Sequence, residues 1–129
     1  MNAPGGSRKE MVKFVKEITA EARSRKKNAA VAVQNAEELL TDSSYVDAID
    51  AVGKEDLYHG IKHDRSRNDA GAVKASVKQL KKARAAGKGV HVIEYLEGTA
   101  AADVRSAARR DGFVASTSGN RLLTDASSD

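Results

Sequence analysis

Apolar residues recur at helical spacing near the amino terminus, where one side of the chain carries Met11, Val12, Phe14, Val15, Ile18 and Ala22. Ser7 and Glu10 stand three residues apart, as in a capping box, and the pattern predicts an amphipathic helix from Ser7 to about Arg25. A short apolar run follows from Ala29 to Val33. It lacks clear polar alternation, which is typical of a strand covered on both faces.

The rest of the chain alternates apolar runs of strand length with helical patterns. Strands are predicted at Ile49 to Val52, in "GVHVIEYL" (89–96) and in "FVAST" (113–117). Between them, Asp69 is placed to cap a helix over 70–86 that Gly87 ends, and Thr99 is placed to cap a helix that ends at Asp111-Gly112. Strands that alternate with helices of this length favour parallel βαβ units.

The predicted fold is therefore α/β, with about four parallel strands and covering helices. Such units build either a barrel or an open doubly wound sheet, and in both the chemistry gathers at the carboxyl ends of the strands. Within 129 residues one domain is expected, with residues 1–6 as a disordered leader, 7–118 as the folded unit and 119–129 as a flexible tail.

Polar side chains follow each predicted strand. If the carboxyl ends of the strands form one rim, these side chains would surround a single hollow. They are Gln34, Asn35, Glu37 and Glu38; Glu55, Asp56, Tyr58 and His59; Glu94, Tyr95 and Glu97; and residues 116–120. Amides and carboxylates bind sugar hydroxyls, tyrosine stacks on a sugar face, and paired carboxyl groups can act as acid/base and nucleophile at an anomeric carbon. This set of residue types is suited to carbohydrate chemistry.

Structural roles compete with the functional ones at several of these positions. Glu37 and Glu38 could cap a helical turn, Asp56 could be a loop or cap residue, and Glu94 could pair with a lysine of a neighbouring element. His59 and His63 have the spacing of a metal pair, but Gly60 between them favours a solvated loop. We therefore expect no metal and no cofactor, and glycines scattered at 53, 60 and 71 form no nucleotide-binding motif.

Composition narrows the functional classes further. Hydrophobic residues make up 40% of the chain and aromatic residues 4%, so the core is expected to be built from small side chains. The 22 basic residues are interleaved with 18 acidic ones, and with few aromatics to stack on bases this favours solvated helix faces over nucleic-acid binding. No cysteine is present, so disulfides are excluded, and no apolar run has the length of a membrane span.

Five collinear segments resemble the second half of the endo-α-1,4-polygalactosaminidase family of glycoside hydrolases. They are "SRKEMVKFVKEI", "VAVQNAEELL", "YVDAIDAVGKEDLYHG", "GKGVHVIEYL" and "RRDGFVAST", which together run from about Ser7 to Thr117. The resemblance implies a (β/α)8 barrel of which this chain carries strands five to eight. It also implies a secreted parent enzyme that acts on galactosamine-containing or related polysaccharide.

The resemblance assigns roles to particular residues. Glu55 matches the general acid/base, and the rim positions that would line the sugar subsite are matched by Gln34, Asn35, Glu94 and Tyr95. The family's presumed nucleophile is an aspartate after the fourth strand, and nothing in "MNAPGGS" can replace it. Weak or absent hydrolysis is therefore expected for this chain alone.

Half a barrel would leave its two edge strands unpaired. A homodimer or a missing amino-terminal half could cover its open edges. In a homodimer, however, the partner's last strand would bring Ala115 to Ser118 to the empty place, and none of these is a carboxylate. An alternative reading is a non-catalytic α/β interaction or self-assembling module, and a basic nucleic-acid binder is the third.

Overall fold

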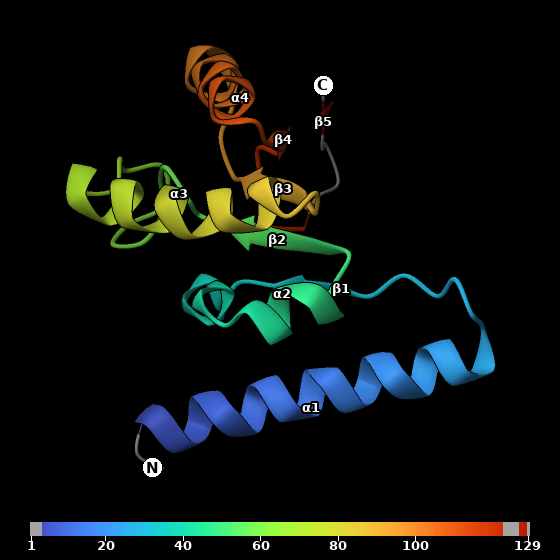
Figure 1. The fold of residues 1–129 in the computed structure, drawn as a ribbon. Helices are drawn as coiled ribbons and strands as arrows, with labels where there is room; N and C mark the ends of the chain where they lie inside the picture. The colour runs from blue at the N-terminus through green and yellow to red at the C-terminus, as the bar shows by residue number, and fades with distance from the viewer. Residues whose placement is uncertain (1–3, 123–126, 129) are drawn as a thin grey trace.

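Four parallel strands form the sheet at the centre of the molecule, and they lie side by side in chain order (Figure 1). The computed structural model describes residues 4–122 and 127–128, with side chains from residue 7 to residue 122. The parallel strands are β1 (Ala32–Gln34), β2 (Ala51–Glu55), β3 (Gly89–Glu94) and β4 (Val114–Thr117). A two-residue strand, β5 (Ser127–Ser128), pairs antiparallel with β4. The predicted α/β class with four parallel strands is confirmed.

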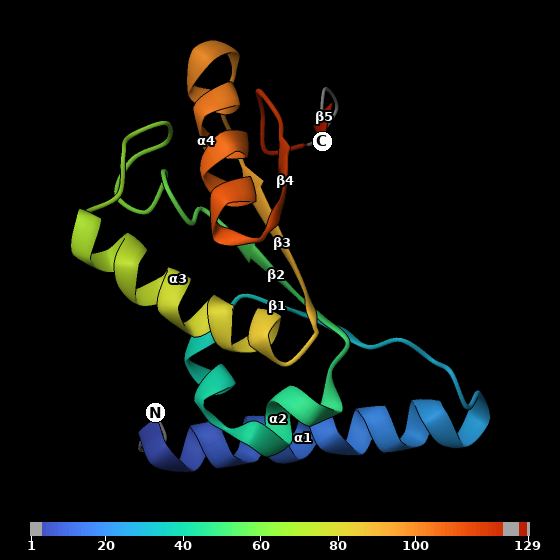
Figure 2. The same cartoon turned by 45° about the horizontal axis from the view of Figure 1, so that its top comes forward.

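Helices connect the strands and cover one side of the sheet. They are α1 (Pro4–Arg25), the 3-10 helix η1 (Glu37–Thr41), α2 (Ser43–Ala48), α3 (Ala70–Ala85) and α4 (Gly98–Asp111). Helix α3 packs on β2 and β3, and α4 packs on β3 and β4. Figure 2 shows α3 and α4 on the same side of the strands, as expected for consecutive parallel strands whose crossovers have one hand. This is the layout of half a (β/α)8 barrel.

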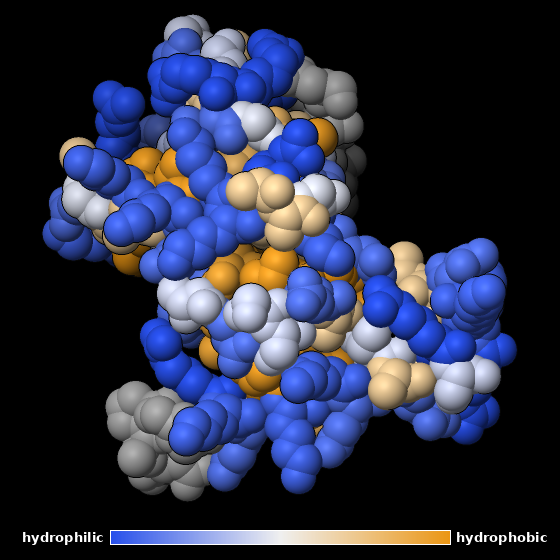
Figure 3. Space-filling model, in the orientation of Figure 1, coloured by the Kyte–Doolittle hydropathy of each residue, from blue (hydrophilic) through white to orange (hydrophobic). Residues whose placement is uncertain are grey.

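The two faces of the sheet differ sharply in burial. On the helix side, Val52, Val90, Val92 and Ala115 are at most 4% exposed and join the helices in one hydrophobic core. The opposite side, here called the open face, alternates with it and carries Ala32, Gln34, Ala51, Gly53, Glu55, Gly89, His91, Ile93, Val114 and Ser116. Seen from the direction of Figure 1, the outer surface is mostly hydrophilic, with hydrophobic side chains visible in the seams between elements (Figure 3).

Several predicted boundaries are wrong in informative ways. Helix α1 begins at Pro4, so residues 4–6 are not a leader and Ser7 is an internal helical residue rather than a cap. Proline suits the first helical position because its missing N–H needs no partner there. Residues 1–3 lie outside the described part of the chain.

The first two strands lie later in the chain than predicted, and they run into the polar residues Gln34 and Glu55. Strands with one uncovered face can accept such residues. The carboxyl-terminal segment also differs from the expected tail, since residues 119–122 make side-chain contacts and Ser127–Ser128 pairs with β4, whereas residues 123–126 and 129 lie outside the described residues.

We expect Val92→Ala to lower the free energy of unfolding by about 2–3 kcal/mol, because it removes two methyl groups from a closed core. The matched change Val114→Ala removes the same groups from the open face, where the side chain is 52% exposed, and should stay within about 0.5 kcal/mol. Chemical denaturation of both variants measures the difference. Equal losses would contradict the assignment of the two faces.

Candidate functional site

The chain leaves β1 and β2 through residues in the left-handed conformation. Asn35 and Ala36 follow β1 with φ of 59° and 53°, and Asp56 follows β2 with φ of 54°. Asn and Asp tolerate this region better than other side chains, whereas Ala36 pays roughly 1–2 kcal/mol for it. Uncommon backbone conformations thus coincide with the carboxyl ends of two neighbouring strands, where function in parallel sheets concentrates.

Glu55 is the centre of a group of polar side chains at this end of the open face. The Tyr95 hydroxyl donates a hydrogen bond to its Oε1, and the Asn35 side-chain oxygen accepts its backbone N–H at 3.0 Å. The side chains of Gln34 and Asn35 also help to lower the pKa of the Glu55 carboxyl. Four of the five residues that the sequence assigned to the site therefore come together from β1, β2 and the end of β3.

These contacts favour the charged form of Glu55. The Tyr95 hydrogen bond holds the pKa of the carboxyl below its ordinary value, the Gln34 and Asn35 hydrogen bonds act in the same direction, and Arg121 adds a favourable charge, while partial desolvation opposes them. The same desolvation and the Glu55 contact raise the pKa of Tyr95 to about 12, so its hydroxyl stays a donor. At neutral pH Glu55 is a carboxylate, ready to accept a proton or a hydroxyl hydrogen bond.

Arg121 is a member of this group that sequence reasoning missed, because its segment was taken for a flexible tail. Its guanidinium carbon lies 4.3 Å from the centre of the Tyr95 ring. It also pairs with Asp56 at 3.2 Å and with Asp64 at 2.7 Å. Hydrogen bonds to Asp64 and Asp56 raise the Arg121 pKa, so the cation is permanent. Stacking on a tyrosine that donates to Glu55 ties the carboxyl-terminal segment to the site.

Glu94 does not reach the open face, and its expected place in the sugar subsite is wrong for this structure. It follows Val90 and Val92 on the helix side, and its side chain is 0% exposed. Its carboxylate accepts the backbone N–H groups of Leu57 at 2.7 Å, Tyr58 at 3.3 Å and His59 at 3.0 Å. A fully buried carboxylate that binds three backbone donors fastens the loop after β2.

Burial dominates the ionisation of Glu94. Desolvation raises its pKa to about 7 although the three N–H groups stabilise the charged form. The Nδ1 atom of His59 lies 3.9 Å from Oε1 of Glu94, beyond hydrogen-bonding distance. Burial lowers the pKa of this histidine, with Arg67 adding to the effect. The pair therefore does not form a strong ion pair at neutral pH.

The other candidates at the strand ends have structural contacts. Glu37 points to the helix side, where it pairs with Lys54 at 3.2 Å and accepts the Ser76 hydroxyl at 2.8 Å, with both members of the ion pair about 15% exposed. Tyr58 donates its hydroxyl to Asp111 at 3.0 Å, and Glu97 pairs with Arg65 at 3.6 Å on the surface. Glu38 is exposed, and its backbone oxygen accepts the Thr41 hydroxyl.

The last two strands add one polar contact to the open face. His91 Nε2 and Ser116 Oγ lie 2.7 Å apart, across neighbouring strands β3 and β4. Ser118 is buried and donates its hydroxyl to the Asn120 carbonyl at 2.7 Å, which shapes the turn after β4.

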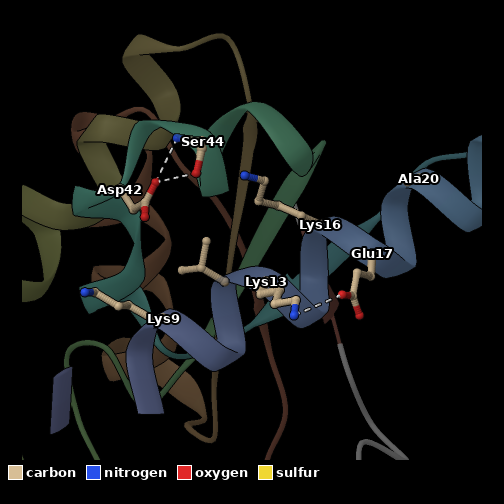
Figure 4. A pocket seen from close by; sticks show the side chains of 8 residues that line it. Lys9, Lys13, Lys16, Glu17, Ala20, Asp42 and Ser44 are labelled. Atoms are coloured by element: carbon tan, nitrogen blue, oxygen red, sulfur yellow. Dashed lines mark hydrogen bonds and ion pairs between the residues drawn. The ribbon is translucent and has the colours of Figure 1, made fainter. Parts of the chain in front are cut away.

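A separate hollow of about 440 Å³ lies between α1 and the start of α2 (Figure 4). Lys9, Lys13 and Lys16 line it, together with Glu17, Ala20, Asp42 and Ser44. Asp42 caps α2 through the Ser44 N–H at 2.9 Å, and Lys13 approaches Glu17 at 3.9 Å. The hollow is lined by helix and loop residues and holds none of the open-face side chains named above.

In the described part of the chain, no cluster of three or more His, Cys, Asp and Glu side chains has the arrangement of a metal site. None of the helices described there combines the length and the apolarity that crossing a bilayer requires.

Comparison with known proteins gives one informative relative. No protein-family model matches the chain. An uncharacterized protein of Deinococcus radiodurans is 34% identical over 109 residues, which cover 84% of this chain but 34% of the relative. The chain thus spans about a third of that protein, whose length is about 320 residues because 109 residues are 34% of it. The matched region is one part of a longer polypeptide in that organism.

We expect Tyr95→Phe to raise the pKa of the Glu55 carboxyl, because it removes the hydrogen bond that most favours the charged form. Carbon-detected NMR titration of the glutamate carboxyls measures the change. Tyr58→Phe is the matched control, since its hydroxyl binds Asp111 and should leave Glu55 unaffected. An unchanged Glu55 titration in Tyr95→Phe would contradict this geometry.

Glu94 should make stability depend on pH. Its folded-state pKa of about 7 lies above the ordinary 4.5, so its stabilisation is fully present below about pH 4.5 and is lost as pH rises through 7. Relative to Glu94→Gln, the wild-type free energy of unfolding should fall by up to about 3 kcal/mol across this window. The pKa of His59 is lowered, so its contribution to the free energy of unfolding rises with pH. Because His59 is present in both proteins, this contribution largely cancels in the comparison.

Denaturation at several pH values measures these slopes, with the exposed Glu97→Gln as control. The control should retain the wild-type slope. A Glu94→Gln profile parallel to that of the wild type would exclude the carboxyl as the source.

Proposed function

We propose that this chain is the carboxyl-terminal half of a glycoside-hydrolase-like barrel, and that Glu55 is the acid/base of that enzyme. The substrate class would be galactosamine-containing or related polysaccharide. The observation that carries the proposal is the grouping of Glu55 with Gln34, Asn35 and Tyr95 on the open face, at the carboxyl ends of parallel strands. A carboxylate among amide and hydroxyl groups is suited to binding and protonating a sugar oxygen.

Hydrolysis requires a second carboxylate. Among the residues that β1 to β4 direct to the open face, Glu55 is the one with a carboxyl group. Asp56 and Asp64 lie nearby but are both paired with Arg121. In the complete enzyme, Glu55 would protonate the leaving oxygen while an aspartate from outside the described residues attacks the anomeric carbon. Glu55 would then remove a proton from the water that releases the sugar.

In this half alone, the lowered pKa of Glu55 does not suit a general acid. A general acid must hold a proton near neutral pH, whereas Tyr95 and the amides keep Glu55 ionised here. A second carboxylate roughly 5 Å away, as in retaining enzymes, would raise the pKa of Glu55 by like-charge repulsion. We therefore expect this half to bind sugar without cleaving it.

The second candidate function is a non-catalytic α/β interaction module. It is favoured by the exposed apolar residues Met11, Phe14 and Ile18 on α1, which are 43–56% exposed. An interaction module would use this surface without needing Glu55.

The test is NMR titration of the isolated chain with a galactosamine oligosaccharide. We expect shifts centred on Gln34, Asn35 and Tyr95, at least fivefold weaker binding by Glu55→Gln, and no release of reducing ends. Glu38→Gln makes the same substitution on an exposed residue outside the group and should bind as the wild type does. Shifts located elsewhere, or equal binding by Glu55→Gln and Glu38→Gln, would reject the proposal.

A further inference from the structure

The amino-terminal end of the open face is lined by very small side chains. The strand register places Ala32 beside Ala51 and Ala51 beside Gly89, so one row across three strands holds two alanines and a glycine. The next row contains Gly53 between Gln34 and His91. A barrel interior is filled by layers of side chains at close-packed density. Small residues on one wall therefore leave room for large residues from the opposite wall.

Helix α1 has a wide apolar side, and its neighbour α2 covers about half of it. At 100° per residue, the apolar side chains from Phe14 round to Val12 span an arc of about 160°. Val12, Val15 and Thr19 are buried, at 8%, 8% and 4% exposure, and Thr19 donates its hydroxyl to the Ala48 carbonyl of α2. The other half of the arc, Met11, Phe14 and Ile18, is 47%, 56% and 43% exposed.

These two surfaces belong to the same end of the molecule. Strand β1 is the edge of the sheet, since β2 is its one partner among the described strands. Helix α1 lies beyond β1 and α2 at that end in both views (Figures 1 and 2). If a parallel strand preceded α1 and lay beside β1, the right-handed crossover rule would place α1 on the helix side of that strand, where the uncovered half of α1 could pack on it.

We propose that the open face and the uncovered side of α1 form one docking surface for a complementary βα segment with large apolar side chains on its inward face. Its first contact would be a strand parallel to β1. This inference rests on the half-barrel part of the proposed function and is independent of its sugar chemistry.

A second copy of this chain is a poor occupant of that surface. It would oppose the Ala32–Ala51–Gly89 row with another row of alanine and glycine, and the unfilled volume between two such rows is destabilising. The Deinococcus relative instead offers a source of different sequence. About 210 of its roughly 320 residues lie outside the match, and a complete barrel takes about 250 residues. That is enough chain for the four missing βα units.

The experiment co-expresses the full chain with the part of the Deinococcus relative that lies outside the 109 matched residues. We expect a 1:1 complex by light scattering and native mass spectrometry. Two variants probe the two surfaces: Ala32→Leu adds bulk to the small-residue row, and Phe14→Asp places a charge on the uncovered side of α1. Each should weaken the complex at least tenfold while the circular dichroism spectrum of the chain stays unchanged.

Matched controls make the same substitutions elsewhere on the surface. Ala72→Leu lies on an exposed position of α3, and Ala20→Asp lies on the opposite side of α1 from Ile18 and Phe14. Both should assemble as the wild type does. Failure to form the complex, a tight homodimer of the chain that Ala32→Leu leaves intact, or equal effects of variants and controls would overturn the inference. A complex that forms without galactosamine binding would instead reject the sugar chemistry alone.

Discussion

The buried carboxylate of Glu94 fixes the longest loop of the molecule to the sheet. By binding the N–H groups of residues 57–59 it sets where the loop leaves β2, and Asn68 continues the attachment by donating its side-chain amide to the carbonyls of Asp56 and Leu57. Asp56 and Asp64 are held in place by this loop, and they in turn hold Arg121 against Tyr95. The position of the Glu55 group therefore depends on a contact on the other side of the sheet.

The two faces of the sheet have different roles in this chain. Val52, Val90 and Val92 supply cohesion on the helix side, where even the ion pair of Lys54 with Glu37 is largely shielded. The open face has no comparable core and carries the polar group around Glu55. Because side chains alternate strictly along a strand, Glu55 lies on the open face while its neighbour Lys54 points to the helix side and pairs with Glu37.

The periodic elements were predictable from the sequence, and the exceptions have clear reasons. Helix α3 and strand β3 have strong local signals, namely regular apolar spacing and a β-branched run between glycines. Strands β1 and β2 were misplaced because a strand with one open face continues through polar residues. Glu94 was misassigned although it shares the parity of Val90 and Val92, a signal that could have placed it on the buried face. Arg121 had no such signal, since its role comes from tertiary contacts alone.

Gly60 shows how little room for sequence change this arrangement leaves. Its φ is +102°, and a Cβ there would lie 2.5 Å from Oδ1 of Asp56. A side chain at this position would therefore meet the Asp56 carboxylate that pairs with Arg121, in addition to straining the left-handed backbone. The next residue, Ile61, is 59% exposed and has room for other side chains. Two adjacent positions of one surface loop thus differ in how much side chain they accept.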